Sequence, residues 1–176
     1  TAVARAVGLN VALTEAIALG HDCGHGPGGH ASEDAFDAYI EGGYDHGPWG
    51  ADVVLTSLNL TAQTLDGIRN HSWSRPAPST VEGEIVSWAD RIAYCAHDLE
   101  DAIYAGIVDV GDIPEVVREV AGVTRRQQLA TFINGVIDTT ARTGVVGLDA
   151  VTAEALAELR RFNYERIYTR PESVAQ

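Results

Sequence analysis

The sequence predicts an all-α protein, and three observations carry that prediction. No convincing alternating strand pattern or hairpin signal appears, although residues 145–148 are ambiguous. Capping residues such as Asn10 and Thr80 stand where apolar helical patterns begin, and glycines or prolines stand where they stop. From Thr80 onward, apolar residues recur at helical spacing at Val81, Ile85, Trp88, Ile92, Leu99 and Ile103.

Residues 21–33 are the most unusual run in the chain, because they combine three histidines, two carboxylates and four glycines. A helix that starts at Asn10, with Leu13, Ala16, Ile17 and Leu19 on an apolar side, leads into it. That helix places His21 and Asp22 at its last turn, and Gly24 is expected to end it. A glycine-rich loop follows up to His30. The pattern is helical again from Ala31, with Phe36, Tyr39 and Ile40 as apolar positions. We therefore expect the imidazoles and carboxylates of this run to point into one place.

Further helices are expected along the rest of the chain. One opens at Asp45 or His46 and carries Val53, Val54 and Leu58. A loop with Pro76 and Pro78 precedes the long helix from Thr80. The other expected helices cover residues 60–71, 114–120, 123–142 and 152–168.

The composition is that of a soluble globular protein with one core. The chain has 176 residues, 45% of them hydrophobic, and no apolar run approaches the length of a membrane span. The N-terminus lacks the pattern of a signal peptide, so the cytoplasm is the simplest location. Two cysteines, Cys23 and Cys95, form neither a disulfide framework nor a zinc cluster, and we expect both to be small apolar fillers.

The net charge of −13 argues against extensive electrostatic binding to the nucleic-acid backbone, because phosphate contacts need clustered positive charge. A small anion can still bind locally. Every basic residue is an arginine. A buried arginine can bind a phosphate through two parallel hydrogen bonds, but a GC-rich genome also explains the absence of lysine.

Two places in the sequence suggest a metal site. The adjacent His21 and Asp22 offer an imidazole and a carboxylate, a mixture suited to zinc, iron, manganese or magnesium, although a capping pair explains them equally well. Asp90 lies within the long apolar helix, where an unpaired charge would be costly. A metal ion would explain it, and so would a salt bridge to an arginine.

The joint pattern resembles the HD-domain metal phosphohydrolases, and within them the deoxyguanosinetriphosphate triphosphohydrolase-like branch. The resemblance implies an all-α HD-domain helical bundle, with residues 1–176 as a single HD-type domain. Five blocks carry it in order and span nearly the whole chain: HDCGHGPGGHASEDA, YDHGPWGADVV, GIRNHS, VEGEIVSWADRIAYCAHDLEDAIYAGI and RRFNYERIY.

The resemblance implies a divalent metal ion held by two histidines and two aspartates. His21, Asp22 and Asp90 match three of these ligands, while the other histidine belongs to a segment upstream of Thr1. We therefore expect the domain to be truncated at its N-terminus, with a C-terminal truncation left open, and this set of three ligands to hold metal weakly. The identity of the metal, among manganese, magnesium, iron and zinc, stays open.

The same resemblance gives roles to further residues. It implies acid–base chemistry for His30, with Glu33 as its acidic partner, and for His46 as a further active-site histidine. His25 and Arg91 match phosphate contacts, and Tyr94 and Asp98 match positions near the sugar. The last two follow Asp90 by four and eight residues, so on one helix all three share a side.

Other polar and aromatic residues are interpreted as structural. These are His71 and His97, the packing residues Trp49, Trp73 and Trp88, and the surface pairs Arg125–Arg126 and Arg160–Arg161.

The resemblance implies hydrolysis of deoxynucleoside triphosphates, such as dGTP, to deoxynucleoside and inorganic triphosphate, by a protein that forms homo-oligomers. Such a reaction needs charge neutralisation at the α-phosphorus, an activated water and a proton for the leaving group. Two alternatives stay open. One is another HD-family nucleotidase or phosphodiesterase, and the other is a non-catalytic nucleotide-binding regulatory protein.

Overall fold

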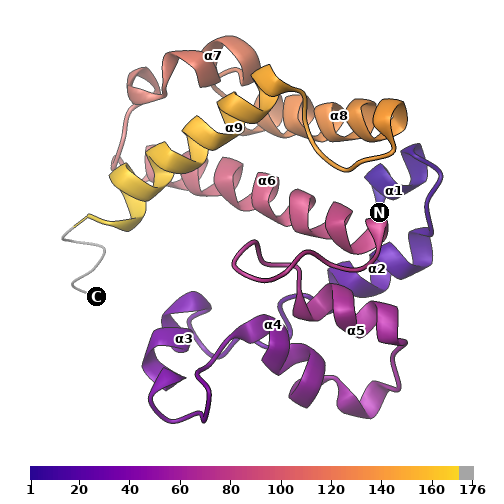
Figure 1. Cartoon of the computed structure of the whole chain (residues 1–176). Coiled ribbons are helices and arrows are strands. Elements are labelled where there is room, and N and C mark those ends of the chain that lie inside the picture. The colour runs from indigo at the N-terminus through magenta and orange to yellow at the C-terminus, as the bar shows by residue number, and fades with distance from the viewer. Residues whose placement is uncertain (171–176) are drawn as a thin grey trace. The chain divides into compact units, whose positions relative to one another are not determined.

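The computed structural model describes residues 1–170, which form helices joined by loops and contain no strand (Figure 1). The predicted all-α class is therefore confirmed. The elements are α1 (Ala2–Ala6), α2 (Val11–Gly20), α3 (His30–Asp37), α4 (His46–Trp49), the π-helix η1 (Gly50–Val54), the 3-10 helix η2 (Thr56–Leu58), α5 (Ala62–Arg69), α6 (Val81–Tyr104), the 3-10 helix η3 (Val110–Asp112), α7 (Glu115–Ala121), α8 (Arg125–Thr143), α9 (Ala150–Asn163) and the π-helix η4 (Tyr164–Tyr168).

The chain divides into two compact units, Thr1–Ser87 and Trp88–Gln176, and the division falls within α6. The first contains the histidine-rich run and the second contains Asp90. That residues 1–176 form one domain stays a prediction.

Side-chain caps explain why several helices begin where the sequence predicts. Asn10 Oδ1 accepts a hydrogen bond from the Leu13 amide at 3.1 Å at the start of α2. Thr80 Oγ1 accepts from the Gly83 amide at 3.1 Å at the start of α6. Each cap satisfies an amide that has no partner within its helix, so the local sequence fixes these starts.

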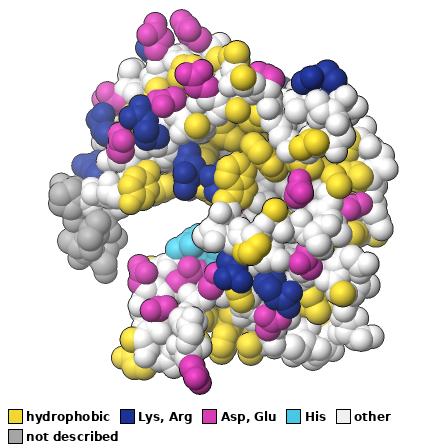
Figure 2. Space-filling model, viewed as in Figure 1, with side chains coloured by type: hydrophobic (Ala, Val, Ile, Leu, Met, Phe, Trp, Pro, Cys, Tyr) yellow, Lys and Arg dark blue, Asp and Glu magenta, His cyan; other side chains and the backbone are white. Residues whose placement is uncertain are grey.

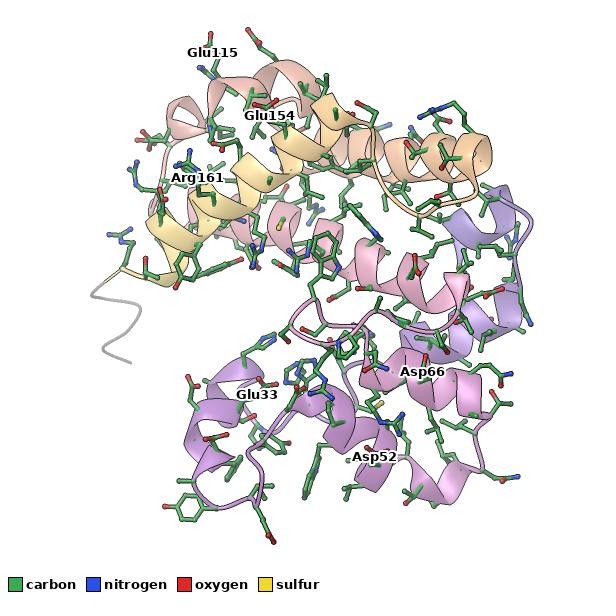
Figure 3. The ribbon with its side chains drawn as sticks, viewed as in Figure 1. Glu33, Asp52, Asp66, Glu115, Glu154 and Arg161 are labelled. Carbon is green, nitrogen blue, oxygen red and sulfur yellow. The ribbon has the colours of Figure 1, made fainter. Side chains whose placement is uncertain are left out.

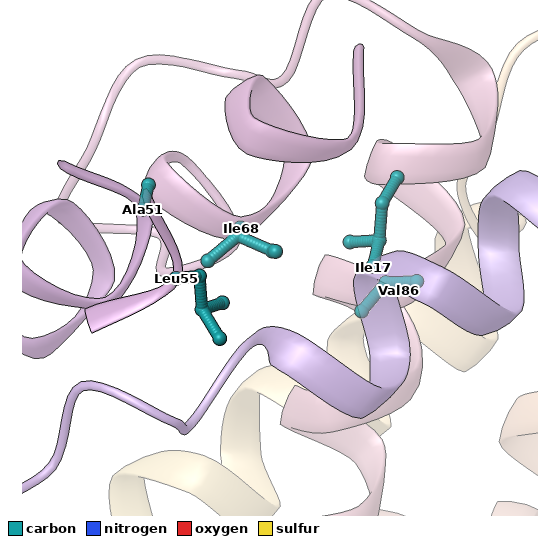
Figure 4. Packing of buried hydrophobic residues seen from close by; sticks show 5 residues of the cluster. All are labelled: Ile17, Ala51, Leu55, Ile68 and Val86. Carbon is teal, nitrogen blue, oxygen red and sulfur yellow. The ribbon is translucent and has the colours of Figure 1, made fainter. Parts of the chain in front are cut away.

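The core of the first unit joins α2, η1, α5 and the start of α6 (Figure 4). Two glycines allow α2 and α5 to pack closely. A Cβ atom at Gly20 would lie 2.6 Å from Ile68 Cδ1, and one at Gly67 would lie 2.5 Å from Ile17 Cδ1. Because His21 follows α2 and His71 follows α5, this packing also brings the histidine-bearing ends of the two helices together. The buried apolar side chains of this core are Ile17, Ala51, Leu55, Ile68 and Val86.

Several apolar residues of the first unit lie at the surface, although the sequence predicts that they lie on the apolar faces of helices. Leu19 is 76% exposed, so its place on the apolar side of α2 was wrong, whereas Ile17 is fully buried. Tyr39 and Leu58 are 82% and 60% exposed. Helical spacing identifies residues that share a face, but the short helices around α3 and α4 cover too little surface to bury them all.

In the second unit, a buried polar contact joins α9 to α6. Asn163 is fully buried, and its Nδ2 donates to the Cys95 carbonyl oxygen at 2.8 Å. The two blocks of sequence that contain Asn163 and Cys95 thus hold each other in place. Among the described residues, no helix has the length and apolar character needed to cross a membrane.

We predict that Ile68→Ala destabilises the protein by about 2–5 kcal/mol, because the substitution leaves a cavity between α2 and α5. Urea denaturation followed by circular dichroism measures the change in unfolding free energy. Leu19→Ala is the control, because that side chain is exposed, and it should change stability by less than about 0.5 kcal/mol. Equal effects of the two substitutions would contradict the packing described above.

Candidate functional site

The segment between α2 and α3 begins with a sharp turn, and this turn packs against α4 and the start of η1. His21 and Asp22 follow directly on α2, and the Cys23 and His25 amides donate to the Gly20 and Asp22 carbonyl oxygens, each at 3.1 Å. A Cβ atom on Gly24 would lie 2.0 Å from the His46 carbonyl oxygen and 2.5 Å from the Gly50 amide nitrogen. Only glycine permits this approach, which places the His21–His25 turn against His46.

The loop that follows is fixed by glycine conformations and one serine. Gly28 and Gly29 adopt positive φ angles of 93° and 62°, which side chains other than glycine's rarely allow. Ser32 is buried, and its Oγ accepts from the Gly26 amide at 3.1 Å and donates to the Gly29 carbonyl oxygen at 2.6 Å. The loop is thus held in the shape that starts α3 at His30.

His21 and Asp22 are arranged as two adjacent ligands of a metal ion would be. His21 Nδ1 lies 2.8 Å from the Ala18 carbonyl oxygen, which can only accept, so Nδ1 carries the hydrogen. The other ring nitrogen, Nε2, lies 3.1 Å from Asp22 Oδ2. Ligand atoms about 2.1 Å from a metal ion lie about 3.0–3.4 Å apart, so this pair fits the metal expected from the sequence.

The carboxyl group of Asp22 is ionised at neutral pH. Its hydrogen bond with His21 outweighs the opposing effect of burial and, with the nearby His25 and His46 rings, lowers the pKa of Asp22 to about 2. The pKa of His25 is also lowered, by burial and by the neighbouring His46, which favours its neutral form. An ionised carboxylate and a neutral imidazole are the forms in which these two groups can bind a metal ion.

Glu33 connects α3 to α4 through His46. Its Oε1 accepts a hydrogen bond from the His46 backbone amide at 3.2 Å and forms a short contact with His46 Nδ1. The sequence pairs Glu33 with His30, but the hydrogen bonds of the described residues pair it with His46 instead. Since α3 begins at His30, that ring is at the exposed start of the helix, whereas Glu33 lies one turn further and faces α4.

Two further imidazole rings, those of His25 and His30, lie beside His46 of this pair. The His25 and His46 rings stack with centroids 3.7 Å apart and an interplanar angle of 14°. The His30 ring lies edge-on to both, at 4.7 Å from His25 and 5.3 Å from His46. His25 Nδ1 is buried without a hydrogen-bond partner among the described residues and lies 3.8 Å from Glu33 Oε1. In Figure 3, ring side chains gather beside the labelled Glu33, and Figure 2 shows histidine at the surface beside acidic side chains.

His71 also belongs to this cluster, although its place in the sequence had suggested a purely structural role. Its side chain is 2% exposed, its Nδ1 lies 2.7 Å from the Ile68 carbonyl oxygen, and its Nε2 lies 3.0 Å from His46 Nε2. The available signal was its place in the GIRNHS block, directly after α5. Five of the six histidines of the chain therefore lie in one cluster in the first unit.

Two groups of ligand atoms in this cluster are spaced closely enough to hold a metal ion. The first consists of His25, His30, Glu33 and His46, and the second of Asp22, His46 and His71. His46 belongs to both, because its two ring nitrogens face opposite directions.

The remaining predicted residues lie on α6 in the second unit. They are Asp90, Arg91, Tyr94 and Asp98. Arg91 is 8% exposed, and burial lowers the pKa of its guanidinium and raises that of the Tyr94 hydroxyl. Asp98 accepts a short hydrogen bond from the Tyr168 hydroxyl, so the carboxylate expected near a sugar is engaged within the protein.

The two cysteines differ. Cys95 is fully buried, and burial raises the pKa of its thiol to about 12, as suits an apolar filler. Cys23 is exposed, so its interpretation as a filler was wrong.

A separate pocket of about 510 Å³ lies in the first unit between α2 and α5. Asn10, Leu13, Leu60 and Thr64 are among its lining residues, and none of the clustered histidines lines it.

The chain belongs to the HD domain family, whose pattern matches residues 1–95. The HD domain is an all-α fold, and HD domains generally depend on metal ions, in agreement with the helices and the ligand clusters described above.

The chain is similar to proteins named deoxyguanosinetriphosphate triphosphohydrolase-like protein. It is 38% identical over 172 residues to one from Caldanaerobacter subterraneus subsp. tengcongensis, with 94% of this chain and 50% of that protein covered. It is 36% identical over 185 residues to one from Clostridium perfringens strain 13, with 94% and 54% covered. A relative from Desulfatibacillum aliphaticivorans is 35% identical over 187 residues, with 96% and 53% covered. The chain spans about half the length of these curated relatives. The predicted family resemblance is confirmed.

We predict that Gly24→Ala lowers the melting temperature and weakens divalent metal binding, because its Cβ would collide with the backbone of His46 and Gly50. Thermal denaturation and calorimetric titration with Mn²⁺ measure the two effects. Gly147→Ala is the matched control, since its Cβ would meet no atom within 4 Å and its backbone needs no positive φ. A Gly24→Ala protein with the stability and metal affinity of the control would refute the close approach.

Proposed function

We propose that this protein hydrolyses deoxynucleoside triphosphates, with dGTP as a representative substrate, to deoxynucleoside and inorganic triphosphate in a metal-dependent reaction. The observation that carries the proposal is the cluster of five histidines with Asp22 and Glu33 in the first unit. The names of the similar proteins from Caldanaerobacter and Clostridium support the substrate class. Five imidazoles and two carboxylates rarely lie together in a unit of this size unless they bind a ligand.

His21, Asp22 and Asp90 are the proposed metal ligands of this chain. Because His21 Nδ1 donates to the Ala18 carbonyl oxygen, Nε2 is the ring nitrogen left to bind a cation, and Asp22 is ionised beside it. A bound divalent cation would supply Lewis-acid stabilisation of the charge on the reacting phosphate. On a chain of net charge −13, that local positive charge is what a polyphosphate needs.

Glu33 and His46 are the proposed acid–base pair, with His30 beside them. Glu33 accepts two hydrogen bonds from His46, which fixes the orientation of the ring. Protonation of the leaving 5′-oxygen needs a donor of this kind. His30 is the most exposed member of the cluster and is placed to exchange protons between the pair and water.

His25 is the proposed phosphate contact in the first unit. Its buried Nδ1 has no hydrogen-bond partner among the described residues, so a phosphate oxygen would satisfy it. Arg91 is the proposed phosphate contact of the second unit, and Tyr94 and Asp98 are proposed to contact the sugar. The fit of a 2′-deoxy sugar against such residues would exclude ribonucleotides by crowding their extra hydroxyl group.

The proposed location and assembly of the protein are those of a soluble enzyme of nucleotide metabolism. We propose a cytoplasmic homo-oligomer that needs neither nucleic acid nor a membrane for the reaction.

We predict that His46→Gln lowers kcat for triphosphate release from dGTP by about 100-fold or more, because glutamine cannot transfer a proton. Inorganic triphosphate is quantified by ion chromatography in the presence of Mn²⁺. His97→Gln is the control, because His97 is exposed and its hydrogen bond is to the Ala93 carbonyl oxygen within its own helix; kcat of this variant should stay within twofold of wild type. Wild-type protein that binds dGTP without releasing triphosphate would instead support a regulatory role.

A further inference from the structure

We infer that the pocket between α2 and α5 binds an uncharged nucleoside, separately from the histidine cluster. The ring of the base lies against the apolar wall of the pocket, and its hydrogen-bonding edge faces Asn59 and Gln63. The pocket does not require triphosphohydrolase activity, since binding can be measured on chelator-treated protein. Only the choice of deoxyguanosine as the probe rests on the proposed function, in which this nucleoside is a product.

The apolar wall of the pocket suits the face of a planar ring. Ala12 and Ala16 are one helical turn apart on α2, so their methyl groups line the pocket on the same side of that helix. Leu13 and Leu60, both half-buried, add larger apolar side chains. The volume of about 510 Å³ lies within the range of about 300–1,000 Å³ that is usual for pockets that bind small organic molecules.

Two amide side chains in the lining have hydrogen-bonding groups to spare. Asn59 and Gln63 are exposed, and neither side chain forms a hydrogen bond within the described part of the chain. The other polar lining residues include Thr61 and Thr64, whose hydroxyls bond to each other at 2.9 Å, and Asn10, whose Oδ1 caps α2. A carboxamide offers a donor and an acceptor side by side, which is how asparagine and glutamine pair with the edge of a nucleobase.

The backbone of Asn59 keeps its amide in the lining. Asn59 ends η2 with φ 50° and ψ 47°, and it is the only residue other than glycine with a positive φ among residues 1–170. Asparagine adopts this left-handed conformation at less cost than most residues. The turn from η2 toward α5 therefore places residue 59 beside the pocket without using the hydrogen bonds of its side chain.

The charge around the pocket selects against phosphorylated ligands. Among the described residues that line it, none is charged, so an anion would find no ion pair there. Glu82 accepts a hydrogen bond from the Asn10 amide at 3.0 Å, which places a carboxylate beside the lining. The first unit as a whole contains eleven acidic residues and three arginines. This field repels a triphosphate but not a nucleoside, which carries no charge.

The pocket and the histidine cluster use different parts of the same two helices. The pocket is lined by the first half of α2 and the first turn of α5, whereas His21 and His71 follow the last turns. Nine residues separate Ala12 from His21, which corresponds to about 14 Å along a helix. A nucleoside in the pocket is therefore bound without contact to the imidazoles.

The test is the binding of deoxyguanosine to chelator-treated protein, followed by calorimetry and ¹H–¹⁵N NMR. In the wild-type protein, deoxyguanosine should shift the amide resonances of Ala12, Leu60 and Gln63, whereas inorganic triphosphate should leave them unchanged. Ala16→Leu should weaken binding by at least about tenfold, because the larger side chain occupies the space of the ring. Gln63→Ala should weaken it by about three- to tenfold through the loss of hydrogen bonds.

Ala130→Leu is the matched control, because Ala130 is exposed on α8 in the second unit, and its affinity for deoxyguanosine should equal that of wild type. An analogue with a phenyl ring in place of the base should bind at least about threefold more weakly, since it cannot bond to the amides. Equal binding of that analogue would overturn the inference, and so would Ala16→Leu protein with the affinity of the control.

The wild-type resonances keep the test decisive even if a variant unfolds. Shifts confined to His25 and His46, or no shift at all, would refute a nucleoside site in this pocket. Neither result depends on whether dGTP is hydrolysed, and shifts in the pocket would support the site even if the protein releases no triphosphate.

Discussion

The hydrogen bonds from His46 to Glu33 hold together the part of the structure on which the proposed chemistry depends. Glu33 lies on α3 and His46 opens α4, so one carboxylate joins the two short helices that flank the glycine-rich loop. Neither helix is long enough to be stable alone. The same carboxylate fixes the tautomer of His46, which links the local fold to the direction in which the ring can bind a cation or transfer a proton.

Glycine at position 24 is the second constraint, and it acts through the backbone. The turn after α2 passes so close to the His46 carbonyl oxygen and the Gly50 amide that no side chain fits between them. The approach sets His25 against the His46 ring, where the two stack. Packing, loop conformation and the positions of the imidazoles are thus consequences of one close contact.

Much of the fold could be predicted because its signals are local. Asn10 and Thr80 cap helices by bonds to amides three residues on, and helical spacing identifies the long apolar face of α6. The expected pairing of His30 with Glu33 used the same local logic; the two residues belong to one ligand group, and the hydrogen bond of Glu33 goes to His46, thirteen residues away. His71 was missed for the same reason, since its role arises only when α2 and α5 pack side by side. Exposure of Leu19 likewise depends on which neighbours the short helices provide.

The central claim is that this histidine cluster directs water to the α-phosphorus of a deoxynucleoside triphosphate. Hydrolysis of dGTP in H₂¹⁸O, with mass spectrometry of the products, tests it most directly. The account predicts one ¹⁸O atom in the released triphosphate and none in deoxyguanosine, because the P–O5′ bond breaks. Formation of dGMP and pyrophosphate, or ¹⁸O in the deoxyguanosine, would contradict it.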